Sequence, residues 1–155
     1  MAGLGLVGAG YAGIGGLDVD RDESGAIAEA GELGAFRIRV GDCVNNVSGS
    51  SVESVEGVPC DQPHEAEAYH AFNLPEGDGS FPGQDVVGTA ADQGCYDAFQ
   101  PFVGIAYESS VLEIYSLVPS SGSWSDPTLN DREVLCFVID PNSTPLVGTA
   151  EGQAS

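Results

Sequence analysis

The chain has 155 residues, with 24 acidic side chains against four arginines and no lysine, which gives a formal net charge of −20. This length accommodates one domain, and a hydrophobic content of 42% indicates a folded chain. The scarcity of cations excludes nucleic acid and anionic lipid surfaces as partners, because both require clustered positive charge, whereas a basic partner or divalent cations remain compatible with the acidic surface.

Residues 1–17 carry no charged side chain and are mostly glycine, alanine and larger apolar residues. A stretch of about 17 such residues is just long enough to cross the hydrocarbon core of a membrane. We predict a truncated membrane anchor or signal remnant, which would attach the protein to the membrane. The G-x-G-x-x-G patterns that start at Gly3 and Gly8 have no strand before them, so they do not predict dinucleotide binding.

Residues 18–34 are predicted to be an acidic linker. Within it, Asp20, Asp22 and Ser24 are spaced like the first ligands of a calcium loop. The final ligand position falls on Gly31 instead of a bidentate glutamate, and no amphipathic helix flanks the loop. We therefore prefer a turn, with a calcium-responsive binding module as the alternative.

Residues 35–140 are predicted to form the domain. Apolar residues alternate with arginines from Phe36 to Val40, which is typical of a half-buried strand. Two further strands are expected at residues 52–58 and 66–74, because both runs are bounded by proline or glycine.

A helix is predicted after residues 82–83, where apolar residues recur at helical intervals at Val87, Ala91, Cys95, Phe99 and Phe102. Two more apolar strands are expected at residues 111–118 and 133–139, with a polar loop between them. Residues 141–155 are predicted to be a polar tail. These elements together predict an α+β fold, a small antiparallel sheet with one main covering helix.

The four cysteines contain no C-x-x-C pair, which argues against zinc ribbons and thioredoxin-like redox sites. Two disulfides in an oxidising compartment are the favoured use. Sequential pairing, Cys43 with Cys60 and Cys95 with Cys136, closes the shortest loops. The second bridge would hold the predicted helix against the sheet, because Cys136 falls in the middle of the final strand.

A zinc site is the competing use of one cysteine, since a C-x3-H-x5-H spacing is present. Its ligands would be Cys60, His64 and His70 with either Cys43 or Glu67. Oxidised cysteines do not ligate zinc, so we predict that His64, after Pro63, is a structural histidine bonded to backbone or to Glu67.

Patterns typical of enzymes are missing, because the sequence has neither a G-x-S-x-G elbow nor an S-x-x-K motif. Acid pairs such as Glu65 and Glu67 arise by chance in so acidic a chain. Trp124 with Tyr107 and Tyr115 offers an aromatic platform for a sugar or peptide, although a lone tryptophan more often packs in a core or loop. We predict no catalytic residue and no cofactor, with a hydrolase of cell-wall polymers as the alternative.

Several segments resemble one known family when taken in this order. They are FRIRVGDCV at 36–44, VEGVPCDQPHEAEAYHAF at 55–72, FPGQD at 81–85, the lone Trp124, and DREVLC at 131–136. Together they are similar to the septum formation family of actinobacterial membrane proteins and lipoproteins.

This resemblance implies an extracytoplasmic domain behind a membrane anchor, with a link to cell division or envelope assembly. It implies no catalytic residue. The family-like motifs contain Asp42, Pro63, His64, Glu67 and Trp124, for which we expect structural roles. We therefore predict a noncatalytic interaction domain on the outer face of the cell membrane, or secreted, with an envelope or membrane protein as its partner.

Overall fold

The computed structural model describes residues 18–47 and 53–154. A six-stranded antiparallel sheet organises them in the order β1-β3-β2-β4-β6-β5. The strands are β1 Gly31–Gly34, β2 Cys43–Asn45, β3 Ser54–Val58, β4 Ala66–Asn73, β5 Glu113–Leu117 and β6 Glu133–Ile139. The helices are α1 Gln84–Val103 and α2 Ser121–Ser125, with 3-10 turns η4 Ala35–Arg37 and η5 Tyr107–Ser109. The predicted α+β class is confirmed.

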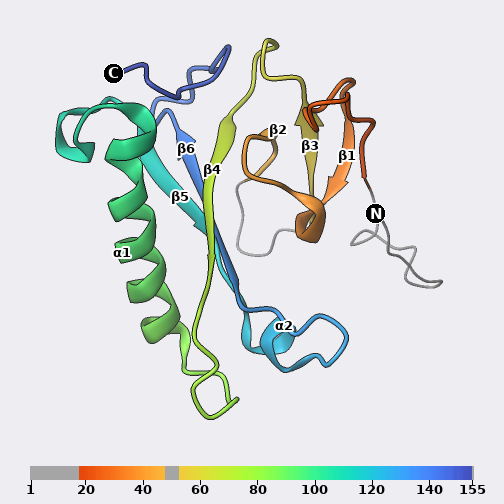
Figure 1. Cartoon of the computed structure of the whole chain (residues 1–155), viewed down its shortest axis with the longest axis vertical. Helices are drawn as coiled ribbons and strands as arrows, with labels where there is room; N and C mark the ends of the chain where they lie inside the picture. The colour runs from red at the N-terminus through yellow and green to blue at the C-terminus, as the bar shows by residue number, and fades with distance from the viewer. Residues whose placement is uncertain (1–17, 48–52, 155) are drawn as a thin grey trace.

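The sheet separates two apolar clusters. In β6, Val134 and Cys136 belong to a cluster shared with α1, whereas Leu135 and Phe137 belong to a second cluster shared with β1, β2 and β3. This alternation follows from the period of two in a strand. Figure 1 shows α1 beside β4, β5 and β6, with β1, β2 and β3 gathered on the other side of the molecule.

The predicted helix is confirmed as α1, and one stripe of apolar residues explains its placement. Every fourth residue on this stripe is buried, namely Val87, Ala91, Cys95, Phe99 and Val103. Gly104 ends the helix in the left-handed conformation, at φ 99°, and donates its amide to the Gln100 carbonyl. No helix within the described residues is long and apolar enough to cross a membrane, and the anchor predicted for residues 1–17 lies outside them.

Both predicted disulfides are present. Cys43, at the start of β2, is bonded to Cys60, which follows β3. Cys95 of α1 is bonded to Cys136 of β6, 41 residues away in sequence, and this bridge holds the helix on the sheet. In the chain-entropy model a loop of this size corresponds to about 4 kcal/mol of stabilisation.

The predicted strand between Phe36 and Val40 is wrong. Ile38 is buried, but Phe36 and Val40 are 51% and 53% exposed. The Asp42 carboxylate accepts the Arg39 amide at 2.8 Å, and the Asp42 amide donates to the Arg39 carbonyl. Asp42 thus closes a turn by bonding the backbone of Arg39, and this turn overrides the local alternation of apolar residues.

The other predicted strands correspond to β3, β4, β5 and β6, although Val52 lies outside the described residues. The polar loop before β6 contains the unpredicted helix α2. Its start is fixed by a reciprocal cap, because Ser120 and Ser123 each bond the other's backbone amide.

The segment predicted as an acidic linker also contributes a strand. β1 lies within residues 18–34 and pairs with β3, with Gly31 opposite Gly57. An added Cβ at Gly57 would come within 2.9 Å of the Ile27 side chain. The close approach of these segments therefore depends on glycine.

The polar segment after Pro141 lies against the domain. We call residues 141–154 the C-terminal strap. Leu146 forms an antiparallel bridge with His64, and the Gly152 amide donates to the Phe102 carbonyl at the end of α1. The strap thereby reaches from the start of β4 to the end of α1, as the blue trace in Figure 1 shows.

Candidate binding pocket

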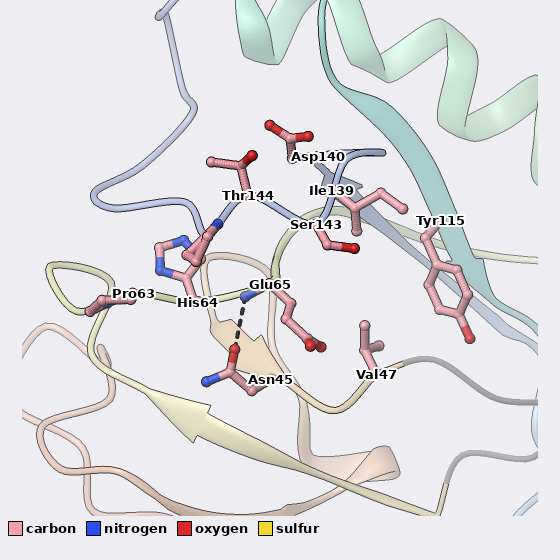
Figure 2. Close-up of a pocket in the computed structure, with 11 residues that line it drawn as sticks. Asn45, Val47, Pro63, His64, Glu65, Tyr115, Ile139, Asp140, Ser143 and Thr144 are labelled. Carbon is pink, nitrogen blue, oxygen red and sulfur yellow. Dashed lines mark hydrogen bonds between the residues drawn. The ribbon is translucent and has the colours of Figure 1, made fainter.

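A pocket of about 430 Å³ opens where the strap crosses the start of β4 and the end of β6. We call it the strap pocket. Its apolar wall includes Val47, Tyr115 and Ile139, and its carboxylates are Glu65 and Asp140. Figure 2 shows Tyr115 at one end of this group and Pro63 at the other.

Hydrogen bonds between the end of β2 and the residue before β4 hold the Glu65 side of the pocket. The Asn45 side chain accepts the Glu65 amide at 2.9 Å, the bond drawn in Figure 2. The Asn46 amide donates to Glu65 Oε1 at 2.7 Å, and Asn46 has the left-handed φ of 64° that asparagine tolerates. Glu65 therefore has one oxygen bound to backbone and a second available to a ligand.

A tight turn forms the opposite side of the pocket. The Asp140 carboxylate accepts the Asn142 amide at 2.8 Å, and the Ser143 amide donates to the Asp140 carbonyl. Ser143 has a left-handed φ of 62°. This strained conformation turns the chain into the strap and keeps Asp140 at the pocket.

Tyr115 supplies the aromatic part of the wall. Its ring packs on Phe137 with 6.1 Å between centroids. Burial raises the pKa of Tyr115, so the phenol keeps its proton at neutral pH and can donate to a ligand.

Asp42, from the GDC segment, forms a buried ion pair. Its two carboxylate oxygens accept Nη1 and Nη2 of Arg21 at 2.8 and 2.9 Å. The side chains of Asp42 and Arg21 are 3% and 9% exposed. The hydrogen bond to Asp42 raises the pKa of Arg21, and the pair joins the N-terminal segment to the turn before β2.

His64 is buried and also lines the strap pocket. Its Nδ1 lies 2.7 Å from the Gln62 carbonyl, and because a carbonyl only accepts, Nδ1 carries the proton. Nε2 is buried and has no hydrogen-bond partner among the described residues. Pro63 lines the pocket next to His64, so both residues shape the entry to β4.

Glu67 binds the strap through both of its carboxylate oxygens. It is 3% exposed, and its two oxygens accept the Thr149 hydroxyl at 2.6 Å and the Ala150 amide at 2.7 Å. These charge-assisted bonds compensate for the burial of the carboxylate.

The fold brings together three of the residues considered for the alternative zinc site. Within the described ranges, the ligand atoms of Cys43, His64 and Glu67 lie within 4.8 Å of one another. Cys43 is in a disulfide with Cys60, so neither sulfur is a thiolate that binds zinc. His70 stacks near Phe72 instead, with 5.8 Å between ring centroids.

Trp124 lies in a different part of the fold. It is 2% exposed, its Nε1 donates to the Gly79 carbonyl at 3.0 Å, and the Arg132 guanidinium lies 3.7 Å from its ring centroid. Tyr107 packs on Phe99. The three aromatic residues of the alternative platform are therefore not one exposed surface.

The residues of the alternative calcium loop form a turn. The Asp22 carboxylate accepts the Ser24 hydroxyl at 2.6 Å and the Ser24 amide at 2.9 Å, and the Ser24 side chain lowers the pKa of Asp22. The Asp20 carbonyl accepts the Ala28 amide. Calcium binding at Asp20, Asp22 and Ser24 stays a prediction.

Sequence reasoning missed the partners of the buried carboxylates. Arg21 is 21 residues from Asp42, and Thr149 is 82 residues from Glu67. One signal was available for the first pair, because a chain with four arginines has few cations for a buried aspartate. No local signal predicted that Glu65, Tyr115 and Asp140 would share a pocket.

The fold and site define a small disulfide-bonded α+β domain with an acidic, partly apolar pocket. A family model described as septum formation matches residues 23–154. The chain therefore belongs to the septum formation family, and this description points to a role in cell division. No curated protein and no solved structure matches the chain.

Proposed function

We propose that the chain is a noncatalytic interaction domain that acts outside the cytoplasm in cell division or envelope assembly. The strap pocket carries this proposal. It combines an apolar wall with the carboxylates Glu65 and Asp140, and such a combination is typical of sites that recognise a ligand.

The bonding of the polar residues near the pocket supports a noncatalytic role. Glu67 uses both carboxylate oxygens to hold the strap, and His64 uses Nδ1 to hold the Gln62 carbonyl. The described cysteines are all in disulfides. Purified protein incubated with peptidoglycan, with and without divalent metal, is expected to release no soluble fragments, and released fragments would contradict this part of the proposal.

The disulfides support the location, since such bonds persist in oxidising compartments. The anchor proposed for residues 1–17 would keep the domain at the outer face of the membrane. Lysis of cells directly into denaturant that contains a maleimide is expected to leave Cys43, Cys60, Cys95 and Cys136 unmodified, because cysteines in disulfides do not react. Modified cysteines on most molecules would argue against an extracytoplasmic location.

Site-specific photocrosslinking tests the interaction itself. A photoreactive amino acid replaces Thr144 in the strap pocket or, as the matched control, Asp92 on the exposed face of α1. We expect position 144 to crosslink an envelope or membrane protein that position 92 does not reach. Equal crosslinking at both positions, or crosslinks to cytoplasmic proteins alone, would contradict the proposal.

A further inference from the structure

The edge of the sheet lies next to the strap pocket. β5 ends the strand order and pairs with β6 along its length. In an antiparallel pair only alternate backbone groups point toward the neighbouring strand, so the remaining N–H and C=O groups of β5 point outward. Within the described ranges no other backbone segment bonds to them. An extended segment of a partner can therefore pair with this edge.

Tyr115 connects this edge to the pocket. It is the central residue of β5 and also lines the strap pocket (Figure 2). Ile139, at the end of β6, lines the same pocket and lies opposite Glu113 in the β5–β6 ladder. A long side chain from a segment paired with β5 would therefore extend across Tyr115 toward the pocket.

The pocket favours a positively charged side chain. Glu65 and Asp140 line it, and none of the four arginines does. The apolar surface of Val47 and Ile139 suits the methylene stem of a lysine or arginine, while the negative charge of the carboxylates attracts its charged end. An anionic side chain would meet both carboxylates and the net charge of −20.

The opposite edge of the sheet is less suited to a partner. β1 has four residues and begins and ends with glycine, so it offers few side chains for contact. The hollow beside it contains Glu32 and Glu56, with Ala30 and Val55 as its apolar residues. It lacks the aromatic wall that Tyr115 gives the strap pocket.

We propose that an extended basic segment of a partner protein adds to β5 as a further strand and directs a lysine or arginine side chain across Tyr115 toward the carboxylates of the strap pocket. This inference rests on the proposed function, because it specifies the chemistry of the partner at that site. The charge complementarity of the pocket selects the basic side chain, and the outward backbone groups of β5 select the extended conformation.

Defined peptides test this inference by nuclear magnetic resonance on the full chain labelled with nitrogen-15. The probe is a capped peptide of five residues, the length of β5, with a central lysine between valine and threonine residues. We expect saturable shifts of the amide signals of β5 and of Glu65 and Asp140. Binding is expected to weaken several-fold as the salt concentration rises from about 50 to about 500 mM.

Three control peptides separate the contribution of the lysine charge from that of backbone pairing. Norleucine in place of the central lysine is expected to weaken binding at least about fivefold, and glutamate to abolish it. N-methylation of alternate amides is expected to abolish binding, because strand pairing needs those donors. Equal binding of the norleucine peptide would overturn charge recognition, and equal binding of the N-methylated peptide would overturn strand addition.

A pair of variants tests whether the pocket carboxylates recognise the lysine of the peptide. Glu65→Gln combined with Asp140→Asn keeps oxygen acceptors for the Asn46 and Asn142 amides and is expected to weaken the lysine peptide about tenfold. Asp92→Asn removes one charge from the exposed face of α1 and is expected to leave binding unchanged. An equal loss in both variants would overturn the location, and soluble wall-glycan fragments that shift the β5 signals when peptides do not would overturn a protein partner.

The photocrosslinking experiment distinguishes a failed inference from a failed function. If the Glu65→Gln, Asp140→Asn double variant still crosslinks the same envelope protein through position 144, the interaction function stands and basic recognition is overturned. If position 144 crosslinks no protein even in the unmodified domain, the proposed interaction function itself is overturned.

Discussion

Three buried polar residues differ in how many hydrogen-bond partners they have, namely Asp42, His64 and Glu67. Asp42 is paired with Arg21, and Glu67 has two donors from the strap. His64 has a partner for Nδ1 alone among the described residues. Since an unpaired charge is costly in a protein interior, the two carboxylates depend strongly on their partners.

Asp42→Asn is expected to lower the free energy of unfolding by about 2 to 4 kcal/mol, because it removes the buried counter-charge of Arg21 and leaves, among the described residues, only the longer pair with Asp18, at 3.7 Å. Urea unfolding followed by circular dichroism measures this loss. Asp61→Asn, at an exposed position, is the control and should change stability by less than about 0.5 kcal/mol. Equal stabilities for the two variants would show that the ion pair contributes nothing.

Tyr69 makes the free energy of unfolding fall at alkaline pH. Its hydroxyl donates to the Cys95 carbonyl at 2.5 Å, and burial raises its pKa above the ordinary value. The native state keeps a proton that the unfolded chain releases above about pH 10, so stability is complete below that pH and falls as pH rises through the interval up to the native pKa.

We expect the free energy of unfolding to fall by about 1.4 kcal/mol per pH unit for this tyrosine above about pH 10. Tyr69→Phe removes that contribution, although it loses the hydrogen bond to the Cys95 carbonyl, worth about 1 kcal/mol. Urea titrations between about pH 8 and pH 11 therefore give a shallower decline for the variant. Parallel declines would assign the alkaline loss to other groups.

At the scale of elements, α1 shows how tertiary contact decides the effect of a glycine. Gly94 lies where α1 packs on β4, and an added Cβ would overlap the ring of Phe72. Gly88 lies in the same helix with nothing within 4 Å of such a Cβ. Helix propensity alone predicts that alanine stabilises both positions.

We expect Gly94→Ala to destabilise the protein by about 1 to 3 kcal/mol, because the Phe72 ring or the helix must move. Gly88→Ala should stabilise it by about 0.5 to 1 kcal/mol through helix propensity. Differential scanning calorimetry of both variants gives the signs directly. A melting temperature that rises for both would mean that Phe72 yields without cost.

The elements that were predicted correctly share long or strongly patterned sequence. α1 has a buried residue every four positions over 20 residues, and β6 is a run of seven residues with five buried. β1 escaped prediction because GELG contains two glycines and no apolar alternation. The turn before β2 was mistaken for part of a strand because Asp42 bonds both the backbone amide and the backbone carbonyl of Arg39.

At the scale of the whole molecule, the strap joins parts of the fold that are distant in sequence. It pairs with the residues before β4 through Leu146 and with the end of α1 through Ala154, whose amide donates to the Val103 carbonyl. Glu67 lies between these contacts. The strap pocket therefore depends on a segment that composition alone describes as polar.

Thr149→Val removes the hydroxyl that donates to Glu67 and should destabilise the protein by about 1.5 to 3 kcal/mol, since the lost bond is to a charged group. Thr128→Val, at an exposed position, is the matched control and should change stability by less than about 0.5 kcal/mol. Hydrogen exchange should also become faster at the Ala150 and Ala154 amides in the Thr149 variant. Unchanged exchange there would show that Glu67 does not hold the strap.

Local pattern and composition were sufficient for the fold class, the main helix, the later strands and the pairing of the cysteines, because each of these depends on short-range periodicity or on simple spacing. The septum formation motifs could likewise be read directly from the chain. The ion pair of Asp42 with Arg21, the attachment of the strap to Glu67 and the strap pocket depended on the tertiary structure. These contacts join residues 21 to 83 positions apart, and local periodicity contains no information about which distant segments a sheet will bring together.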